Sequence, residues 1–139
     1  MTAARVLTKY RQALRSDLTI VKTSNDGVDA TVFSELHEIS GIKRQFLAES
    51  IFDVSLKTMM RYEKENKKLN PKHSEIALKL MSLFRKGIEI FGSLTSFVSW
   101  LDKPALGLGD QVPMLMLNTI TGMDLVEEEL LRIEHGALA

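Results

Sequence analysis

Four polar side chains near the middle of the chain have residue types and a spacing suited to nucleic-acid contacts: they are Ser55, Lys57, Thr58 and Arg61. They fall at the start of a helix expected over residues 56–63, after a tight turn at Asp53-Val54. Outward-facing hydroxyls and cations there can reach phosphates and base edges, and arginine can hold guanine with two hydrogen bonds. We therefore expect these residues to bind DNA. The alternative is a helical hairpin with exposed charges that binds nothing.

The segment around this helix is patterned like a helix-turn-helix, with two departures from the usual pattern. The turn before Val54 reads Ile51-Phe52-Asp53, where such motifs usually have glycine. The spacing from Ala48 to Val54 is also one residue longer than usual. Ser55 then stands where a helix N-cap belongs, which stabilises a helix by ~1 kcal/mol. The motif is thus expected with an altered turn.

The remaining polar groups do not combine into a catalytic or metal-binding set. His37, His73 and His135 lie on separate expected elements without H-x-x-x-H spacing, and the chain has no cysteine to join them. Zinc is therefore not expected. Gly107 and Gly109 form G-x-G outside the strand–turn–helix context that phosphate binding requires. We expect neither enzymatic activity nor a cofactor.

Three successive acidic residues, Glu127, Glu128 and Glu129, are a further candidate for chemistry. Neighbouring helical positions diverge by about 100°, so these carboxylates cannot converge on one bond as acid–base catalysis requires. A solvated acidic face is the favoured interpretation. A patch that faces a protein partner is the alternative.

The charges of the 139-residue chain cancel overall but are unevenly distributed. Residues 43–88 hold eleven basic and five acidic side chains, whereas residues 92–139 hold two basic and seven acidic ones. Attraction to phosphate acts only over a Debye length of roughly 8–10 Å, so the local excess matters more than the sum. The basic stretch coincides with the helix-turn-helix pattern and favours DNA as its partner.

Apolar residues at helical spacing predict an all-α protein. Helices are expected over residues 6–18, 31–39, 43–52, 56–63, 71–91, 94–101, 113–117 and 122–135. Residues 19–28 are expected to form a linker. The long helix over 71–91 carries apolar residues on two faces, which is typical of a central helix packed by two modules. Trp100 is expected in the core against this helix, and Thr121 with Asp124 resembles a capping box.

Several motifs of the last third are similar to one known domain. The segments FGS…F…WLDKPALGL, VPMLMLNTITGMDLVEEEL and RIEHG resemble the toxin-binding domain of the Xre/MbcA/ParS antitoxins. The upstream VSLKTMMRYEKENKKLNPKHSE resembles the helix-turn-helix of the same proteins. The resemblance runs from about Gly41 to the C-terminus, with both modules in the same order and spacing. The first thirty residues lie outside it.

This resemblance implies the antitoxin of a type II toxin–antitoxin pair. Such a protein represses its operon by binding operator DNA and occludes a partner toxin, typically a RES-domain toxin that consumes NAD. The chain would act as a homodimer within a larger toxin–antitoxin complex. The implied regions are an N-terminal helix and linker over 1–30, an Xre-like DNA-binding domain over 31–91 and a toxin-binding domain over 92–139. The implied toxin contacts are Glu127, Glu128, Arg132, His135, Gly136, Ala137, Leu138 and Ala139.

Two other functions remain open at this point. The chain could be a stand-alone helix-turn-helix regulator whose C-terminal domain only dimerises or senses a ligand. An enzyme with an unrecognised site is a third interpretation, which the absence of a converging set of reactive groups disfavours. No apolar run approaches the ~18 residues of a membrane span, and charges interrupt Met1–Leu18 too often for a signal peptide. We therefore expect a soluble, cytoplasmic protein without a membrane partner.

Overall fold

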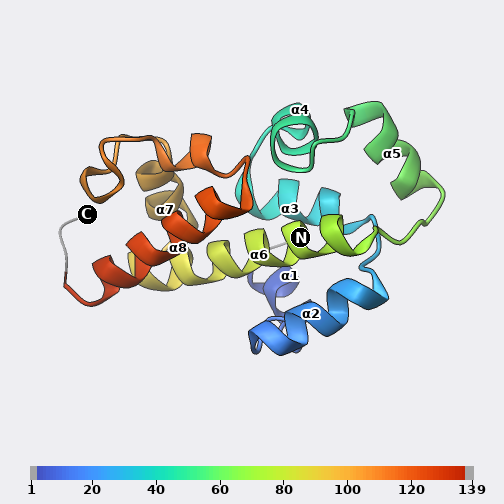
Figure 1. The fold of residues 1–139 in the computed structure, drawn as a ribbon, viewed down its shortest axis with the longest axis horizontal. Helices are drawn as coiled ribbons and strands as arrows, with labels where there is room; N and C mark the ends of the chain where they lie inside the picture. Colours follow the sequence, from blue (N-terminus) through green and yellow to red (C-terminus); the bar gives the residue numbers. More distant parts are fainter. Residues whose placement is uncertain (1–2, 137–139) are drawn as a thin grey trace. The chain divides into compact units, whose positions relative to one another are not determined.

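The computed structural model describes residues 3–136. Over this range the chain is helical and contains no β-strand (Figure 1). This confirms the predicted all-α class. The elements are α1 (Ala3–Lys9), α2 (Asp17–Asp26), α3 (Val32–Ser40), α4 (Arg44–Phe46), the π-helix η1 (Leu47–Ile51), α5 (Leu56–Lys64), α6 (Pro71–Phe91), α7 (Leu94–Leu101), the 3-10 helices η2 (Leu106–Leu108) and η3 (Pro113–Met116), and α8 (Ile120–Glu134). None of the helices in this range is long and apolar enough to cross a membrane.

The chain forms two compact units, one up to Ser82 and the other from Leu83. The boundary falls inside α6, so this helix contributes residues to both cores. In the first unit the rings of Phe33 and Phe52 meet edge to face, with centroids 6.2 Å apart. The helix α6 covers residues 71–91, as predicted for the long central helix.

The N-terminal prediction was wrong in its boundaries. The expected helix over 6–18 ends at Lys9, and α2 occupies the segment that was expected to be a linker. The run Thr19-Ile20-Val21 is β-branched, which favours extended structure. A reciprocal cap outweighs this preference, because the Ser16 hydroxyl accepts from the Thr19 amide at 3.2 Å and the Thr19 hydroxyl accepts from the Ser16 amide at 3.0 Å.

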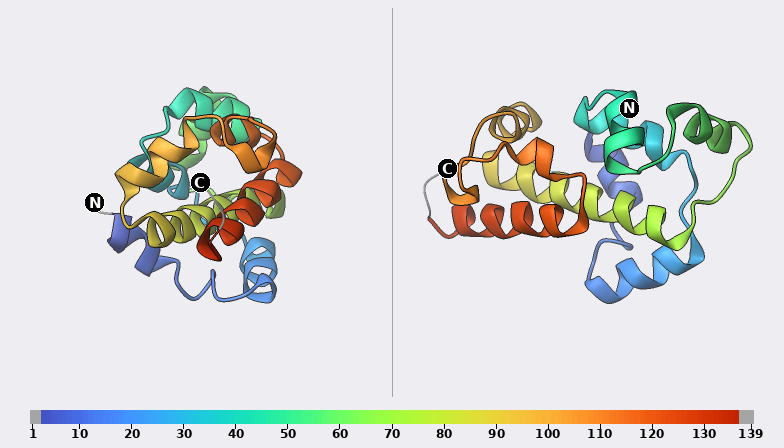
Figure 2. Two further views of the ribbon diagram at one scale, coloured as in Figure 1. Left: turned by 90° about the vertical axis from the view of Figure 1, so that its left-hand side faces the viewer. Right: turned by 45° about the horizontal axis from the view of Figure 1, so that its top comes forward.

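The second unit is built around aromatic side chains from α6 and α7. The Phe97 ring lies 5.1 Å from Phe84 and 6.0 Å from Phe91, measured between centroids. Trp100 is 8% exposed and lies 5.6 Å from Phe91. This confirms the prediction that Trp100 belongs to the core. Figures 1 and 2 show α8 running alongside the part of α6 that belongs to this unit.

The last helix begins earlier than expected. Its N-cap is Thr119, whose hydroxyl accepts from the Gly122 amide at 2.9 Å. The predicted capping box of Thr121 and Asp124 was therefore wrong, since Thr121 is already inside the helix. The inward face of the helix is apolar: Met123, Val126 and Leu130 are buried, and Ile133 is half-buried.

Candidate nucleic-acid interface and partner-binding surface

The start of α5 is fixed by the hydroxyl of Ser55. Its oxygen accepts from the Thr58 amide at 3.0 Å, and the hydroxyl donates to the Thr58 side-chain oxygen at 2.8 Å. The predicted N-cap is thereby confirmed. Because the Ser55 hydroxyl already donates within the helix, the Thr58 hydroxyl is the one that keeps a hydrogen to donate outward.

One face of α5 attaches the helix to the rest of the first unit. Met59 is fully buried, and Glu63 accepts a hydrogen bond from the Ser34 hydroxyl of α3 at 2.7 Å. Tyr62 is half-buried, with the Lys67 ammonium 4.3 Å from the centre of its ring. These contacts determine which side of the helix faces outward.

The outward face of α5 carries three cations and one apolar side chain, all exposed. They are Lys57, Met60, Arg61 and Lys64, at the spacing of one helical face. Together with Thr58 they line one open hollow on the surface. The structure thus brings the predicted residues Lys57, Thr58 and Arg61 together on one surface. It adds Met60 and Lys64, which the charge pattern alone did not single out.

The two departures in the turn before α5 have a common structural explanation. Residues 47–51 form a π-helix, in which the Phe52 amide bonds to the Leu47 carbonyl at 3.0 Å. A π turn accommodates one extra residue within a helix, which accounts for the long spacing from Ala48 to Val54. Asp53 follows with φ 56°, a left-handed conformation that aspartate tolerates better than most residues. The turn is therefore made without glycine.

The three successive glutamates of α8 have three different environments. Glu127 forms an ion pair with Lys86 at 3.1 Å, and both side chains are about one-third exposed. Glu128 is exposed, and no partner for it is found among residues 3–136. Glu129 is only 3% exposed and bonds to the Arg132 guanidinium at 2.6 Å. The expectation of a solvated face was wrong for Glu129, because its position on the helix points it into the second unit.

The buried Glu129 also explains why residue 107 is a glycine. A Cβ atom at Gly107 would overlap the Glu129 carboxylate, so only glycine fits there. Gly109 has φ 64°, a left-handed conformation that glycine adopts freely. Both glycines thus have structural reasons that require no phosphate.

The end of α8 carries the remaining expected toxin contacts. The Arg132 side chain is 60% exposed although its guanidinium is held by Glu129. His135 caps the helix, and Gly136 follows with φ 102°. Ala137, Leu138 and Ala139 lie outside the described residues.

A set of exposed apolar side chains in the second unit was not predicted from the sequence. Its members are Leu106, Leu115, Ile120, Leu125 and Leu131. The alternation of apolar and acidic residues along α8 hints at this, but helical periodicity identifies only the inner stripe. Exposed apolar side chains in such number suit a surface that a protein partner covers.

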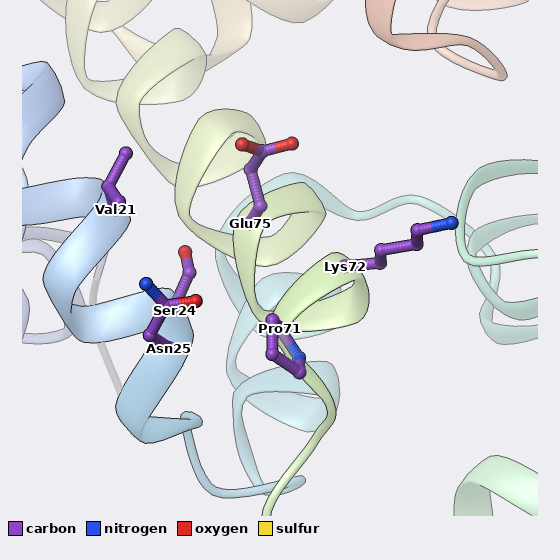
Figure 3. A pocket seen from close by; sticks show the side chains of 6 residues that line it. All are labelled: Val21, Ser24, Asn25, Pro71, Lys72 and Glu75. Carbon is purple, nitrogen blue, oxygen red and sulfur yellow. The ribbon is translucent and has the colours of Figure 1, made fainter.

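No group of three or more histidine, aspartate or glutamate side chains that could hold a metal occurs within residues 3–136. A hollow of about 150 Å³ lies between α2 and the start of α6 (Figure 3). Its polar lining comprises Ser24, Asn25, Lys72 and Glu75. It lacks the histidine or second carboxylate that general acid–base catalysis commonly uses. This hollow therefore has no arrangement typical of an active site.

Comparison with known proteins assigns the C-terminal part of the chain. Residues 86–136 match the model of the antitoxin Xre/MbcA/ParS C-terminal toxin-binding domain. This match supports the antitoxin family that the sequence motifs indicated. No curated protein matches the chain.

Proposed function

We propose that this protein is the antitoxin of a type II toxin–antitoxin pair and that it catalyses nothing itself. The observation that carries this proposal is the match of residues 86–136 to a toxin-binding antitoxin domain. The partner we propose is a RES-domain toxin that consumes NAD, which the chain inhibits by covering its active cleft. A cleft that binds anionic NAD phosphates tends to be electropositive, and the net −5 charge of residues 92–139 is complementary to it.

The toxin-facing surface we propose is the exposed side of α8 together with the residues that follow it. Glu128 lies there without a partner in the described structure, between the exposed side chains of Leu125 and Leu131. Arg132 is exposed and already oriented by Glu129, so little side-chain entropy remains to be lost on binding. Apolar contact area combined with oriented charges is typical of specific protein interfaces.

The first unit is proposed to bind operator DNA and repress the operon of the pair. In this proposal α3, α4 with η1, and α5 serve as an Xre-like helix-turn-helix domain, and α5 enters the major groove. The support is the exposed cationic face of α5, formed by Lys57, Arg61 and Lys64. A homodimer would place two such helices on the half-sites of a palindromic operator.

Co-expression with the neighbouring toxin gene tests the antitoxin proposal. The full chain should restore growth of cells that produce the toxin and should co-purify with it. A double substitution on the proposed surface, Leu125→Asp with Leu131→Asp, should abolish both effects. The matched control is Leu18→Asp with Val21→Asp, since these side chains are at least as exposed but lie in the first unit. Persistent growth arrest with abundant soluble wild-type protein would refute the antitoxin function.

Operator binding is tested on the same chain by two substitutions in α5. Arg61→Ala should weaken binding by ~1–3 kcal/mol if Arg61 contacts a base, and Lys57→Ala should reduce the salt slope by about 1 if Lys57 contacts a phosphate. Lys103→Ala removes an exposed cation of the second unit and serves as the control. Unchanged DNA binding in both α5 variants, with circular dichroism like that of the wild type, would contradict this assignment.

The main rival is a stand-alone regulator whose C-terminal domain dimerises or senses a ligand. The exposed apolar side chains of the second unit are the observation that favours it, because they could equally be covered by a second copy. Under this rival, the Leu125/Leu131 double substitution should change the oligomeric state seen in sedimentation and leave cell growth unaffected. Growth and oligomeric state, measured for the same double substitution, therefore distinguish the two functions.

A further inference from the structure

The exposed face of α5 contains one apolar side chain that the first unit leaves uncovered. Met60 is 52% exposed, whereas its neighbour Met59 is fully buried. Lys57, Arg61 and Lys64 surround it on the same helical face. An apolar side chain among exposed cations contributes nothing to the core of the unit. Met60 is therefore free to contact a partner that approaches the cationic face of α5.

We propose that Met60 contacts the 5-methyl group of a thymine in the major groove and thereby helps to select the operator sequence. This inference rests on the proposed DNA binding of α5. The thymine methyl is the apolar group that base edges present in the major groove. A methionine side chain is long, flexible and polarizable, so it can adapt to a small apolar group at a groove floor. Met60 would thus read a feature that no cation can recognise.

The positions of the surrounding cations fit this role. Lys57 and Lys64 are seven residues apart, which corresponds to roughly 10 Å along a helix. The major groove is about 12 Å wide, so both ammonium groups can approach phosphates at its edges while the residues between them face the bases. Met60 and Arg61 occupy that middle position. The arginine would bind guanine and the methionine an adjacent thymine.

A protein partner on this face is disfavoured by the same arrangement. Covering Met60 with an apolar surface would remove water from three neighbouring cations, which is costly unless each is paired. One methionine offers little area, whereas stable protein interfaces bury about 1,200–2,000 Å² in total. DNA avoids this conflict, because its phosphates supply the partners that the cations need.

The test uses the full-length wild-type chain and the duplex that it selects from a randomised pool. Deoxyuridine replaces thymine at one position after another, which removes the 5-methyl group and leaves the base pairing intact. At the thymine contacted by Met60, the wild type should lose about fourfold in affinity, as expected for one lost methyl contact. Met60→Ala should bind the thymine and deoxyuridine duplexes equally, so the sensitivity disappears with the side chain.

Two variants control for other effects. Arg61→Ala should bind more weakly but keep the fourfold sensitivity at the same thymine, and Met60→Leu should retain part of it. Sensitivity that persists in Met60→Ala, or its absence in the wild type on a selected duplex, would overturn the role of Met60 while leaving the DNA-binding proposal intact. Failure of the wild type to enrich any duplex would overturn the DNA-binding proposal and this inference together.

Discussion

Two buried carboxylates of this protein are each held by a cation that remains exposed. Glu35 is 6% exposed, and its carboxylate lies 2.9 Å from the Lys9 ammonium while accepting a hydrogen bond from Tyr10. The pKa of the Tyr10 hydroxyl is raised above its ordinary value. Burial is the largest cause, and the hydrogen bond to Glu35 is the next. Glu129 is held by Arg132 in the same manner. In both cases the carboxylate is structural, so the acidic residues available to a partner are fewer than the sequence suggests.

Glu127 and Glu128 should therefore behave differently although they are adjacent. Glu128→Gln should leave stability unchanged and weaken toxin binding roughly tenfold, since an exposed charge at an interface is lost. Glu127→Gln removes the partly exposed ion pair with Lys86, which should lower stability by about 0–1 kcal/mol with a smaller effect on the toxin. Thermal unfolding and calorimetric titration with the toxin measure the two quantities. Equal effects of both variants on toxin binding would contradict the narrow surface proposed around Glu128.

His73 should make the stability of the fold depend on pH. It lies half-buried in the first turn of α6, its ring 6.1 Å from that of Phe52, and burial lowers its pKa from 6.5. The folded chain thus prefers the neutral ring, whereas the unfolded chain takes up a proton below about pH 6.5. The stabilisation is fully present above pH 6.5 and is lost as the pH falls through the lowered pKa.

Urea unfolding on both sides of pH 6.5 measures this effect. His73→Gln should flatten the decline in stability on the acidic side relative to the wild type. His135→Gln removes an exposed histidine and serves as the control for the substitution itself. A decline of equal size in His73→Gln would assign the pH dependence to other groups.

At the scale of helices, the sequence predicted most of the helices and the Ser55 cap but not every boundary. Ser55, Asn70 and Ser93 each accept a hydrogen bond from a backbone amide, as an N-cap residue does. The helix α2 was missed because its β-branched residues suggest extended structure, and the cap that starts it requires both partners to be recognised. The π-helix was visible only as a spacing anomaly. Local patterns reveal hydrophobic faces, but hydrogen bonds between side chain and backbone decide where helices begin.

The burial of Gly87 is a second feature that helical periodicity could not explain. A Cβ atom at this position would overlap the Phe97 ring, so the absence of a side chain allows α7 to pack closely on α6. Alanine is favoured over glycine inside a helix by about 1 kcal/mol. Overpacking costs about 1–3 kcal/mol, so Gly87→Ala should be destabilising in spite of this preference.

Chemical unfolding of the full chain measures the cost of Gly87→Ala, and a double-mutant cycle identifies its cause. Combined with Phe97→Leu, which makes space, the alanine should cost less than it does alone. A gain in stability from Gly87→Ala in the wild-type background would show that the ring moves aside freely.

At the scale of the whole molecule, the two units carry opposite charges. Residues 1–82 hold fourteen basic and ten acidic side chains, and residues 83–139 hold four basic and eight acidic ones. Phosphate groups therefore attract the first unit and repel the second, which favours an approach of DNA to the unit that carries α5. This distribution suits the two partners proposed for the chain, DNA and a toxin, and it predicts that the two proposed activities can be lost independently.

Deletion of residues 135–139 tests this independence. The sequence Gly136-Ala137-Leu138-Ala139 is small and apolar, and it can enter a cleft of the toxin without leaving a charged side chain unpaired. The deletion spares Leu130 and Ile133, the last inward-facing residues of α8. Within the described part of the chain it removes bonds at the helix end, such as that from the His135 amide to the Leu131 carbonyl. We expect toxin neutralisation to be impaired, with thermal stability and operator affinity largely unchanged.

Toxin inhibition and operator affinity must be measured on the same truncated protein, because each outcome places the blocking surface differently. A helix end contributes little to stability when its last turn is exposed, so the fold should tolerate the loss. Full inhibition by the truncated chain would locate the blocking surface on the exposed side of α8 around Glu128. Loss of both activities would mean that the tail is structural, and the charge separation between the units would then not correspond to separate functions.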